Sequence, residues 1–466
     1  MNQAIKTVLQ QPSKLIALIV LAAAISVFII PLPEGFDPKL TKTAAMLIAV
    51  MTLIATNFLP EYITFLGFML AAVITGIAPV NVAFGGFTSS VIWLVFGGTM
   101  ISLAIKHTGF SSRFSRIAQS LSSMSYLNIL ILVTFGAFIS GLFMPSSISR
   151  IAILVPIALA LAEQLGFHEG RPGRLGIALA AGLGTYLPGA GILPANLPNV
   201  VMAGAIETTY DIQLTYGKFL LWHFPVTGMI KAAFLVALLA YMYPDKRDDV
   251  SKTTEVIKDT TSQQRLLQFL LIATVALWAT DFLHGIAPGY ISLLVALVVM
   301  LPALKLSPSD ALAGKTNLTP MFMLVGILAI GGVVQHSGIG GHIAQTLIDV
   351  TNPQPNELIR NFSITAGLAG LLTAVATSPG APVILAPLAQ DLSIAMGLPL
   401  TTIINMMVFG ISIQILPYIG TPFIIAMSLS TAPMRDGIKL CLSMAVLSIC
   451  ILGPLTFLWW KLLGFI

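Results

Sequence analysis

The polar stretch Pro145-Ser146-Ser147-Ile148-Ser149-Arg150 decides the fold, because it interrupts a long apolar run. Apolar and small residues precede it from Ile129 to Met144 and follow it from Ile151 to Ala162. A hydrocarbon layer of roughly 30 Å needs only about 20 apolar residues, so these runs place the polar stretch at membrane depth. Irregular backbone is tolerated there only where it is buried in protein or lines a cavity. The pattern predicts a re-entrant helical hairpin over residues 127–166.

The same design recurs near the end of the chain. The segment Ala376-Thr377-Ser378-Pro379-Gly380-Ala381-Pro382 lies between the apolar runs Ile364–Val375 and Val383–Ala389. It predicts a second re-entrant hairpin, over residues 362–397. Two interrupted apolar segments in corresponding places of two halves are the best pointer that a sequence gives to a transporter's binding site.

The composition is that of a membrane protein. Hydrophobic residues make up 56% of the 466 positions and charged residues only 9%, whereas soluble domains carry about 25% charged residues. The net charge of +5 comes mostly from loops, so it bears on topology and not on nucleic acid. Cys441 and Cys450 have no neighbouring His or Cys, which argues against a metal site or a disulfide. We predict an all-α polytopic membrane protein with about 11 transmembrane spans.

The only extended charged stretch divides the chain into two halves. It covers residues 244–265 and is predicted to be a cytoplasmic linker. The run Leu15–Ile30 lacks a small-residue cleavage site, so we interpret it as a retained first span. The predicted organisation is an N-terminal span at 1–33, a first repeat at 34–243, the linker at 244–265 and a second repeat at 266–466.

The two halves can be aligned with each other. His107-Thr108-Gly109-Phe110 matches His336-Ser337-Gly338-Ile339 at an offset of 229 residues. Val155-Pro156-Ile157-Ala158 matches Ala386-Pro387-Leu388-Ala389 at an offset of 231. Internal duplication of this kind indicates a repeat architecture.

The charges indicate that the repeats are inverted. The first half carries Arg113, Arg116, Arg171 and Arg174 in two stretches whose counterparts at 337–350 and 397–400 carry no Lys or Arg. The positive-inside rule therefore places the first set in the cytoplasm and the second outside. We expect a multi-pass protein of the inner membrane with a cytoplasmic N-terminus and a C-terminus outside.

These segments resemble the divalent-anion:sodium symporter (DASS) family of di- and tricarboxylate and sulfate transporters. The likeness extends over nearly the whole chain, and it is clearest from Trp93 to Gly109 and in both hairpins. The family carries Ser-Asn-Thr at each hairpin tip, ten residues before a Pro. The matching positions here are Ser146-Ser147-Ile148 and Thr377-Ser378-Pro379, so Ser replaces both central Asn residues. Its Gly-Thr-Pro-Pro-Asn-like turns correspond to Ala195-Asn196-Leu197-Pro198-Asn199 and Gly420-Thr421-Pro422-Phe423-Ile424.

The resemblance implies two unwound helices, an elevator mechanism, a homodimer and a small anionic substrate bound between the hairpin tips and the turns. The implied substrate-binding residues are Ser146, Ser147, Ile148, Ser149, Arg150, Thr377, Ser378, Pro379, Gly380, Ala381, Asn196, Pro198, Asn199, Thr421 and Pro422.

The resemblance also implies sodium sites, since unwound carbonyls and hydroxyls supply the oxygens that a hard cation needs. The first site would use Ser146, Ser147 and Ala195, but it lacks a further hydroxyl because Leu142 occupies that position. The second would use Thr373, Thr377, Ser378 and Gly420, and by ligand number it is the better candidate. No other cofactor is expected.

Arg150 is a further departure, because the family has a small residue there. A charged side chain at this depth costs at least about 2.5 kcal/mol and marks a functional site. One hypothesis is that Arg150 supplies the positive charge of a missing sodium ion and grips a carboxylate or sulfonate bidentately. The alternative is that it turns away to a main-chain carbonyl or reaches towards the cytoplasm.

The predicted function is secondary active transport of a small carboxylate, sulfate or sulfonate anion, coupled to Na⁺. A Na⁺-independent anion exchanger, with Arg150 in place of one sodium, is the first alternative. A cation/proton antiporter is the second, although neither hairpin tip has the carboxylate that such chemistry needs. A membrane enzyme would need a nucleophile–base pair or a metal cluster, and the six His and two Cys form neither pattern.

Overall fold

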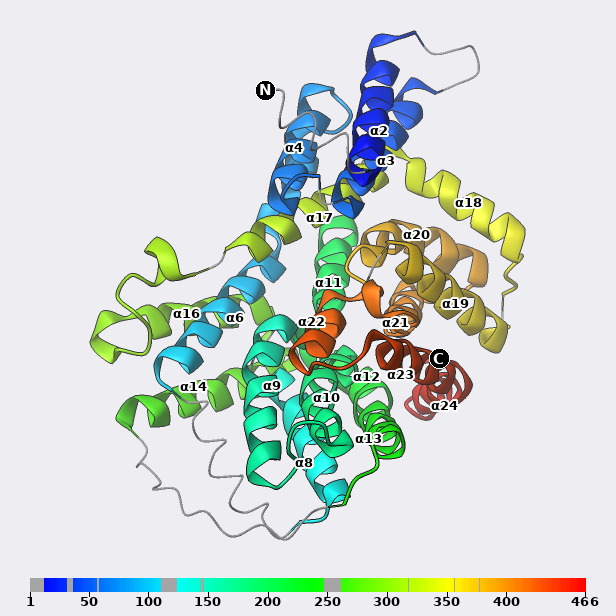
Figure 1. The fold of residues 1–466 in the computed structure, drawn as a ribbon. Helices are drawn as coiled ribbons and strands as arrows, with labels where there is room; N and C mark the ends of the chain where they lie inside the picture. Colours follow the sequence, from blue (N-terminus) through cyan, green and yellow to red (C-terminus); the bar gives the residue numbers. More distant parts are fainter. Residues whose placement is uncertain are drawn as a thin grey trace.

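The computed structural model describes residues 12–31, 37–56, 58–109, 124–142, 144, 146–246, 261–316, 318–355, 357–376 and 378–466. These residues form helices and connecting turns without a β-strand (Figure 1). The prediction of an all-α protein is therefore confirmed for them. Most of the linker 244–265 lies outside the described residues.

The helices of the first half run from the N-terminal span to the linker. They are α2 (Pro12–Ile29), α3 (Pro38–Ala55), α4 (Glu61–Ile74), α5 (Val80–Ala83), η1 (Gly85–Thr88), α6 (Ser90–His107), α8 (Tyr126–Ile139), η4 (Ser140–Leu142), α9 (Ser147–Gln164), α10 (Pro172–Tyr186), η5 (Pro188–Gly191), η6 (Leu193–Ala195), α11 (Leu197–Tyr210), α12 (Tyr216–His223), the π-helical η7 (Phe224–Ile230) and α13 (Lys231–Met242).

The second half begins after the linker. Its helices are α14 (Ser262–Ala279), α15 (Asp281–His284), α16 (Pro288–Met300), η8 (Pro302–Leu304), η9 (Ala311–Lys315), α17 (Thr319–Ser337), α18 (Ile339–Thr351), α19 (Leu358–Ala376), α20 (Ala381–Met396), α21 (Leu400–Ile411), η10 (Pro417–Ile419), α22 (Thr421–Leu429), α23 (Met434–Leu447), η11 (Ser448–Leu452) and α24 (Gly453–Leu462).

Four helices or helix series in the described part of the chain are long and apolar enough to cross a membrane. They are Ser90–His107, Ser147–Gln164, Tyr216–Met242 and Met434–Leu462. Helix α17, from Met321, and α18 would form a fifth span if the 76° bend between them is counted as a break within one span. Further apolar helices of 10–17 residues include both arms of the second predicted hairpin. The count of about 11 spans stays a prediction.

The backbone has matching features in the two halves. Helix α6 ends at His107 and is followed by Gly109 with φ +64°, and α17 ends before Gly338 with φ +80°. Both glycines adopt the left-handed conformation that ends many helices. The arms α9 and α20 each contain an internal proline, Pro156 and Pro387. These matches agree with a duplicated chain, while the domain boundaries stay predictions.

The helices of the two hairpins pack across the halves. Both α8 and α9 pack against α10, and α9 also packs against α22 from the second half. In the same way α20 packs against α21 and against α11 from the first half. Figure 1 shows α22 lying between α9 and α21 in the middle of the molecule. This exchange brings the tip of each hairpin to the centre of the molecule.

Helices α6 and α16 form a separate, close pair (Figure 1). A Cβ atom at Gly97 would lie 2.4 Å from the carbonyl oxygen of Ser292, and one at Gly289 would lie 1.8 Å from that of Ser90. Only glycine permits so close an approach of the two backbones.

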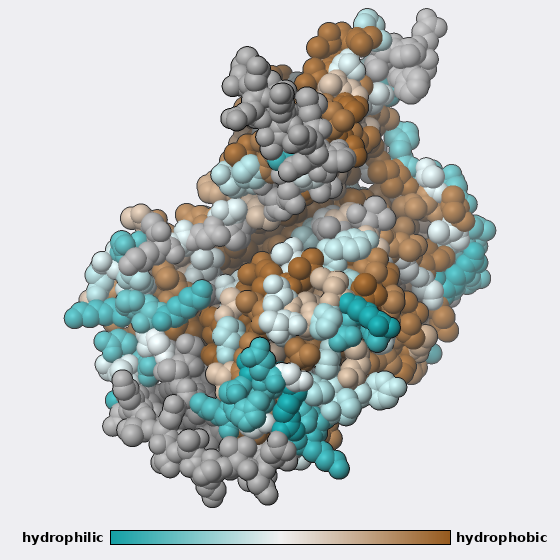
Figure 2. All heavy atoms as spheres, in the orientation of Figure 1, coloured by the Kyte–Doolittle hydropathy of each residue, from teal (hydrophilic) through white to brown (hydrophobic). Residues whose placement is uncertain are grey.

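Large apolar side chains cover the outer surface of the N-terminal helices, which Figure 2 shows as brown areas at the top of the molecule. Ile19 and Ile29 on α2 are 60% and 76% exposed, and Ile74 on α4 is 74% exposed. Contiguous apolar surface of this kind marks contact with lipid or with another protein. It agrees with the apolar composition of the chain.

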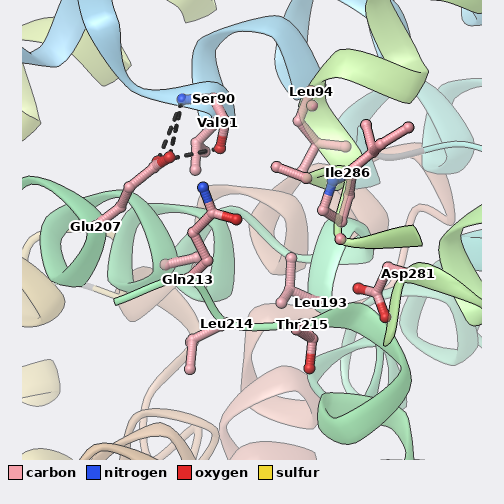
Figure 3. A pocket seen from close by; sticks show the side chains of 15 residues that line it. Ser90, Val91, Leu94, Leu193, Glu207, Gln213, Leu214, Thr215, Asp281 and Ile286 are labelled. Atoms are coloured by element: carbon pink, nitrogen blue, oxygen red, sulfur yellow. Dashed lines mark hydrogen bonds between the residues drawn. The ribbon is translucent and has the colours of Figure 1, made fainter. Parts of the chain in front are cut away.

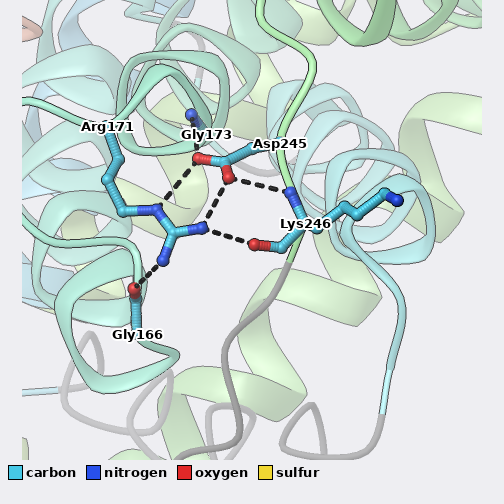
Figure 4. Close-up of polar contacts among 5 residues, drawn as sticks. All are labelled: Gly166, Arg171, Gly173, Asp245 and Lys246. Carbon is cyan, nitrogen blue, oxygen red and sulfur yellow. Dashed lines mark hydrogen bonds and ion pairs between the residues drawn. The ribbon is translucent and has the colours of Figure 1, made fainter.

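A compact polar cluster ties the loop between α9 and α10 to the end of α13 (Figure 4). The Arg171 guanidinium donates to both carboxylate oxygens of Asp245, at 2.6 and 3.3 Å, and to the carbonyl of Gly166 at 3.1 Å. The main-chain N–H groups of Gly173 and Lys246 donate to the same carboxylate. Burial alone would raise the pKa of Asp245, but these hydrogen bonds outweigh it and hold the pKa below its ordinary value.

Candidate substrate and cation site

The first hairpin tip is built around the start of α9. Ser146 is the N-cap residue of α9, and its Oγ accepts a hydrogen bond from the main-chain N–H of Ser149 at 3.2 Å. This side chain satisfies one of the N–H groups that a helix start leaves without a partner. Ile148 is 44% exposed and Ser149 is half-buried. Residues 146–150 are therefore the N-cap and first turn of α9.

Ser147 and Arg150 connect this tip to the unwound segment between α10 and α11. Ser147 Oγ donates to the carbonyl oxygen of Ala195 at 2.9 Å, and Arg150 Nη2 donates to the same oxygen at 2.7 Å. A carbonyl oxygen has two lone pairs, so both positions on Ala195 are used. The geometry brings together Ser147, Arg150 and Ala195, which the sequence predicts to share one site.

The Arg150 guanidinium is fully buried and surrounded by oxygen atoms. Its Nη2 also donates to the carbonyl of Thr185 at 3.0 Å, its Nε donates to Thr185 Oγ1, and its Nη1 donates to the carbonyl of Met144. Four of its five N–H groups are thus used. Arg150 forms no ion pair with any carboxylate in the described part of the chain.

This arrangement has the character of a cation site. The three carbonyls come from Met144 after η4, the end of α10 and the unwound turn, and a hydroxyl completes the set. Carbonyls at half-helix C-termini and in unwound segments are the ligands that transporters use for coupling cations. The guanidinium occupies that oxygen cage as a cation attached to the chain.

The turn before α11 leaves one polar side chain without a partner. Asn196 precedes α11 with φ −132° and ψ 126°, and its side chain makes no capping hydrogen bond. It is 7% exposed, and its Oδ1 has no hydrogen-bond partner. Asn199 differs, because its Nδ2 donates to the carbonyls of Ala190 and Ile192 and so holds the unwound segment together. Pro198 lies in the first turn of α11.

The second hairpin tip approaches the second unwound segment. The N–H of Ser378 donates to the carbonyl of Ile419 at 2.9 Å, and Ser378 is buried. Gly420 follows with φ −130° and ψ 116°, almost the same conformation as Asn196. Thr373 Oγ1 donates to Ala369 in its own helix, which leaves its lone pairs available. Thr377, which is predicted to bind both the substrate and the second sodium ion, lies outside the described residues.

The remaining predicted residues of the second half border this tip. Pro379 and Gly380 are half-buried, and Ala381 is buried at the start of α20. Pro422 lies in the first turn of α22, and Thr421 is exposed beside it.

Tyr186 links the two tips and was missed by the sequence analysis. Its hydroxyl donates to Gln414 Oε1 at 3.2 Å. A Cβ atom at Gly420 would lie 1.9 Å from this hydroxyl. Tyr186 follows Thr185, the residue that binds Arg150, so one helix end contacts both sites. The position of Thr185 and Tyr186 just before Pro188 was the only signal in the sequence.

A cavity of about 160 Å³ lies apart from the tips, between α6, α11, α16 and the loop 213–215 that precedes α12 (Figure 3). Glu207 and Asp281 line it, and each holds the start of a helix: Glu207 accepts from Ser90 at 3.1 Å and Asp281 accepts from the N–H of Gly217 at 3.3 Å. Two carboxylates disfavour an anion, and the hairpin tips do not line this cavity. This cavity therefore does not suit an anion, and the tips stay the predicted anion site.

Interrupted apolar helices, two unwound turns and a cation buried where they meet are features of secondary membrane transporters. Comparison with known proteins also indicates a transporter. The profile of the family described as "Sodium:sulfate symporter transmembrane region" matches residues 11–466. The chain belongs to this family of transporters, as the resemblance seen in the sequence predicts, and it is a secondary anion transporter.

Individual relatives are distant. An uncharacterized transporter of Haemophilus influenzae is 21% identical over 91% of this chain and 93% of its own length. The chloroplastic dicarboxylate transporter 2.2 of Arabidopsis thaliana is 21% identical over 96% and 85%. The L-tartrate/succinate antiporter of Escherichia coli is 24% identical over 60% and 58%. The crystal structure of the Alcanivorax borkumensis YdaH transporter aligns with a TM-score of 0.47 and 15% identity, over 85% of this chain and 89% of that one.

Proposed function

We propose that the chain transports a small dicarboxylate-class anion and that Arg150 takes the place of one coupling sodium ion. The observation that carries this proposal is the oxygen cage around the buried guanidinium, formed by Met144, Thr185 and Ala195. The anion class is supported by family membership and by relatives whose names specify dicarboxylate, tartrate and succinate.

The charge of the site supports an anionic substrate. A buried cation without a carboxylate partner is costly, and an anion beside it lowers that cost. Because most N–H groups of Arg150 already bind the chain, its charge acts from within the site, and direct contacts fall to other groups. The Nδ2 group of Asn196 and the N–H groups at the starts of α9 and α20 are donors suited to that role.

Coupling to Na⁺ is assigned to the second tip. Thr373 and Ser378 lie in the second half with Gly420, and within the described residues no basic side chain is hydrogen-bonded to them as Arg150 is to the first cage. We propose that this tip binds one Na⁺ when the anion binds. From the family resemblance we also propose that the hairpins move as an elevator and that the protein is a homodimer. We propose that it lies in the inner membrane with a cytoplasmic N-terminus.

Exchange of one anion for another is the second candidate, and the same observation favours it. A sodium ion leaves with its substrate, whereas the guanidinium cannot leave. After the anion is released, the site keeps an unbalanced buried charge, which disfavours return of the empty transporter. A second anion restores the balance, so net transport would give way to exchange.

The test is the thermal stability of the purified protein with succinate, L-tartrate or sulfate, each in Na⁺ and in choline. An anion at 100 times its Kd adds about 2.7 kcal/mol to the free energy of unfolding. We expect a dicarboxylate to raise Tm in Na⁺ and to keep part of that rise in choline, because Arg150 is present in both salts. Succinamide, which has a similar shape without charge, should have no effect.

Two outcomes would contradict the proposal in different ways. Complete loss of the rise in choline would mean that sodium, and not Arg150, supplies the positive charge. No rise with any anion in either salt would contradict a dicarboxylate or sulfate substrate.

A further inference from the structure

Lys231 is a second buried cation, and it lies inside the apolar helix series Tyr216–Met242. It follows the π-helix η7 at the start of α13 and is 1% exposed. Its Nζ donates to the carbonyl oxygen of Ser412 at 2.6 Å. Ser412 is the C-cap residue of α21, the helix that precedes the second unwound segment.

No carboxylate balances this ammonium group in the part of the chain that the structure describes. Asp436 on α23 accepts from the Tyr243 hydroxyl at the opposite end of α13, roughly 18 Å along the helix axis. His223 binds Asn405 at 2.8 Å. Other titratable or charged groups lie on the elements packed against η7 and α13, but none of them is hydrogen-bonded to Lys231. Those that are buried or half-buried are Tyr126, Arg174, Tyr186, Tyr216, His223, Asp436 and Cys441.

Lys231 and Arg150 each bind the end of one broken helix. Arg150 binds the carbonyl of Thr185 at the end of α10, and Lys231 binds that of Ser412 at the end of α21. Both positions lie at the negative end of a helix dipole, which favours a cation. The two side chains differ in one property, because a guanidinium stays protonated in proteins and a buried amine can release its proton.

The position of Lys231 makes both of its protonation states accessible. One carbonyl and a helix dipole stabilise the ammonium form, while complete burial without a counter-charge opposes it. These two effects oppose each other, so both the ammonium and the neutral amine form are accessible. Binding an anion nearby adds a charge that favours the protonated form.

The unwound segment 412–420 connects Lys231 to the second tip. Its first residue, Ser412, accepts the lysine hydrogen bond, and Gln414 binds the Tyr186 hydroxyl. Its last residue, Gly420, lies against the same hydroxyl. A charge-assisted hydrogen bond is roughly twice as strong as a neutral one, so the protonation state of Lys231 changes how firmly this segment is held.

We propose that Lys231 is a proton-binding residue whose protonation accompanies binding of the anion. A proton from water forms one N–H bond with the lone pair of the amine, and the same bond breaks when the anion leaves; no other bond changes. This inference rests on the proposed anion transport. It makes the protein a transporter whose coupling includes a proton besides the fixed charge of Arg150.

The first measurement counts protons. Succinate is titrated calorimetrically into the wild-type protein in phosphate and in Tris at the same pH, and the difference in heat gives the protons taken up per anion. The wild type should take up a measurable fraction of a proton. Lys231→Arg, which keeps a permanent charge, and Lys231→Met, which keeps the length, should lose this uptake. Lys218→Met, on the exposed face of α12, should match the wild type.

The second measurement needs no anion. The difference in Tm between the wild type and Lys231→Arg should vary between about pH 6 and pH 9.5, because only the lysine exchanges a proton there. A constant difference, or unchanged proton uptake in both Lys231 variants, would overturn the inference. If the Tm difference varies but succinate, L-tartrate and sulfate all fail to bind, the proposed function is wrong and the link to the anion falls with it.

Discussion

Replacing Arg150 with methionine should lower the free energy of unfolding by about 3 kcal/mol, because three buried carbonyls each lose a donor at roughly 1 kcal/mol or more. These are the carbonyls of Met144, Thr185 and Ala195. In choline, the anion-induced rise in Tm should disappear in the same variant, since the positive charge at the first tip is gone and no sodium ion replaces it. Thermal unfolding with and without succinate measures both effects.

Two further variants make this result specific. Arg150→Lys keeps the charge but lacks the planar fork, so we expect part of the anion response to remain. Arg174→Met removes an arginine that pairs with Glu163 at the far end of α9, and its response to succinate should be that of the wild type. An unchanged succinate response in Arg150→Met would show that the guanidinium has no part in anion binding.

Replacing Gly420 with alanine is the second change for which we expect a large effect. The added Cβ would lie 1.9 Å from the Tyr186 hydroxyl and 2.8 Å from Cζ of the same ring. Something must therefore shift at the point where the second tip, the unwound segment and α10 meet. Overpacking of this kind costs about 1–3 kcal/mol, and we expect succinate binding to be lost with it.

A matched control and a partial rescue accompany this prediction. Gly370, buried on the hairpin arm α19, has its nearest neighbour 3.6 Å from an added Cβ, so Gly370→Ala should bind succinate normally. Adding Tyr186→Phe to Gly420→Ala removes the closest atom and should recover part of the lost stability. Normal succinate binding by Gly420→Ala alone would show that the second tip tolerates displacement of Tyr186.

The elements of the fold could largely be predicted because local sequence determines them. Pro198 and Pro422 in the first turns of α11 and α22 mark where the broken helices resume, since proline suits the first turn of a helix. Gly109 marks the end of α6. The sequence predicts a hairpin tip at residues 145–150, and the structure shows the start of α9 there, with the Ser146 hydroxyl replacing a missing helical hydrogen bond.

The partners of the charged residues could not be predicted. Arg150 binds main-chain carbonyls 35 and 45 residues away, and any residue type can supply a carbonyl. The contact of Tyr186 with Gln414 spans 228 residues and depends on how the halves pack. Ser146 was expected to bind sodium, but its hydroxyl caps α9; whether it also binds an ion stays a prediction.

The role of Lys231 could not be predicted for a different reason. Its charge inside the apolar run 218–242 was visible in the sequence, and an ionisable residue at membrane depth is a functional hypothesis by itself. It is not among the predicted site residues, because the span carries no interruption like those at the hairpin tips. Only the contact with Ser412 relates it to the second unwound segment.

The central claim is that the Arg150 guanidinium stands in for one coupling sodium ion. The most direct test is the dependence of the succinate Kd on Na⁺ concentration, at constant ionic strength with choline, for the wild type and for Arg150→Ala. Removing the side chain leaves the three carbonyls free to bind an ion, so the slope of log Kd against log [Na⁺] should become steeper by about one ion in the variant. Binding in choline, partly kept by the wild type, should be absent from the variant. The same slope in both proteins would mean that Arg150 and sodium do not share this site.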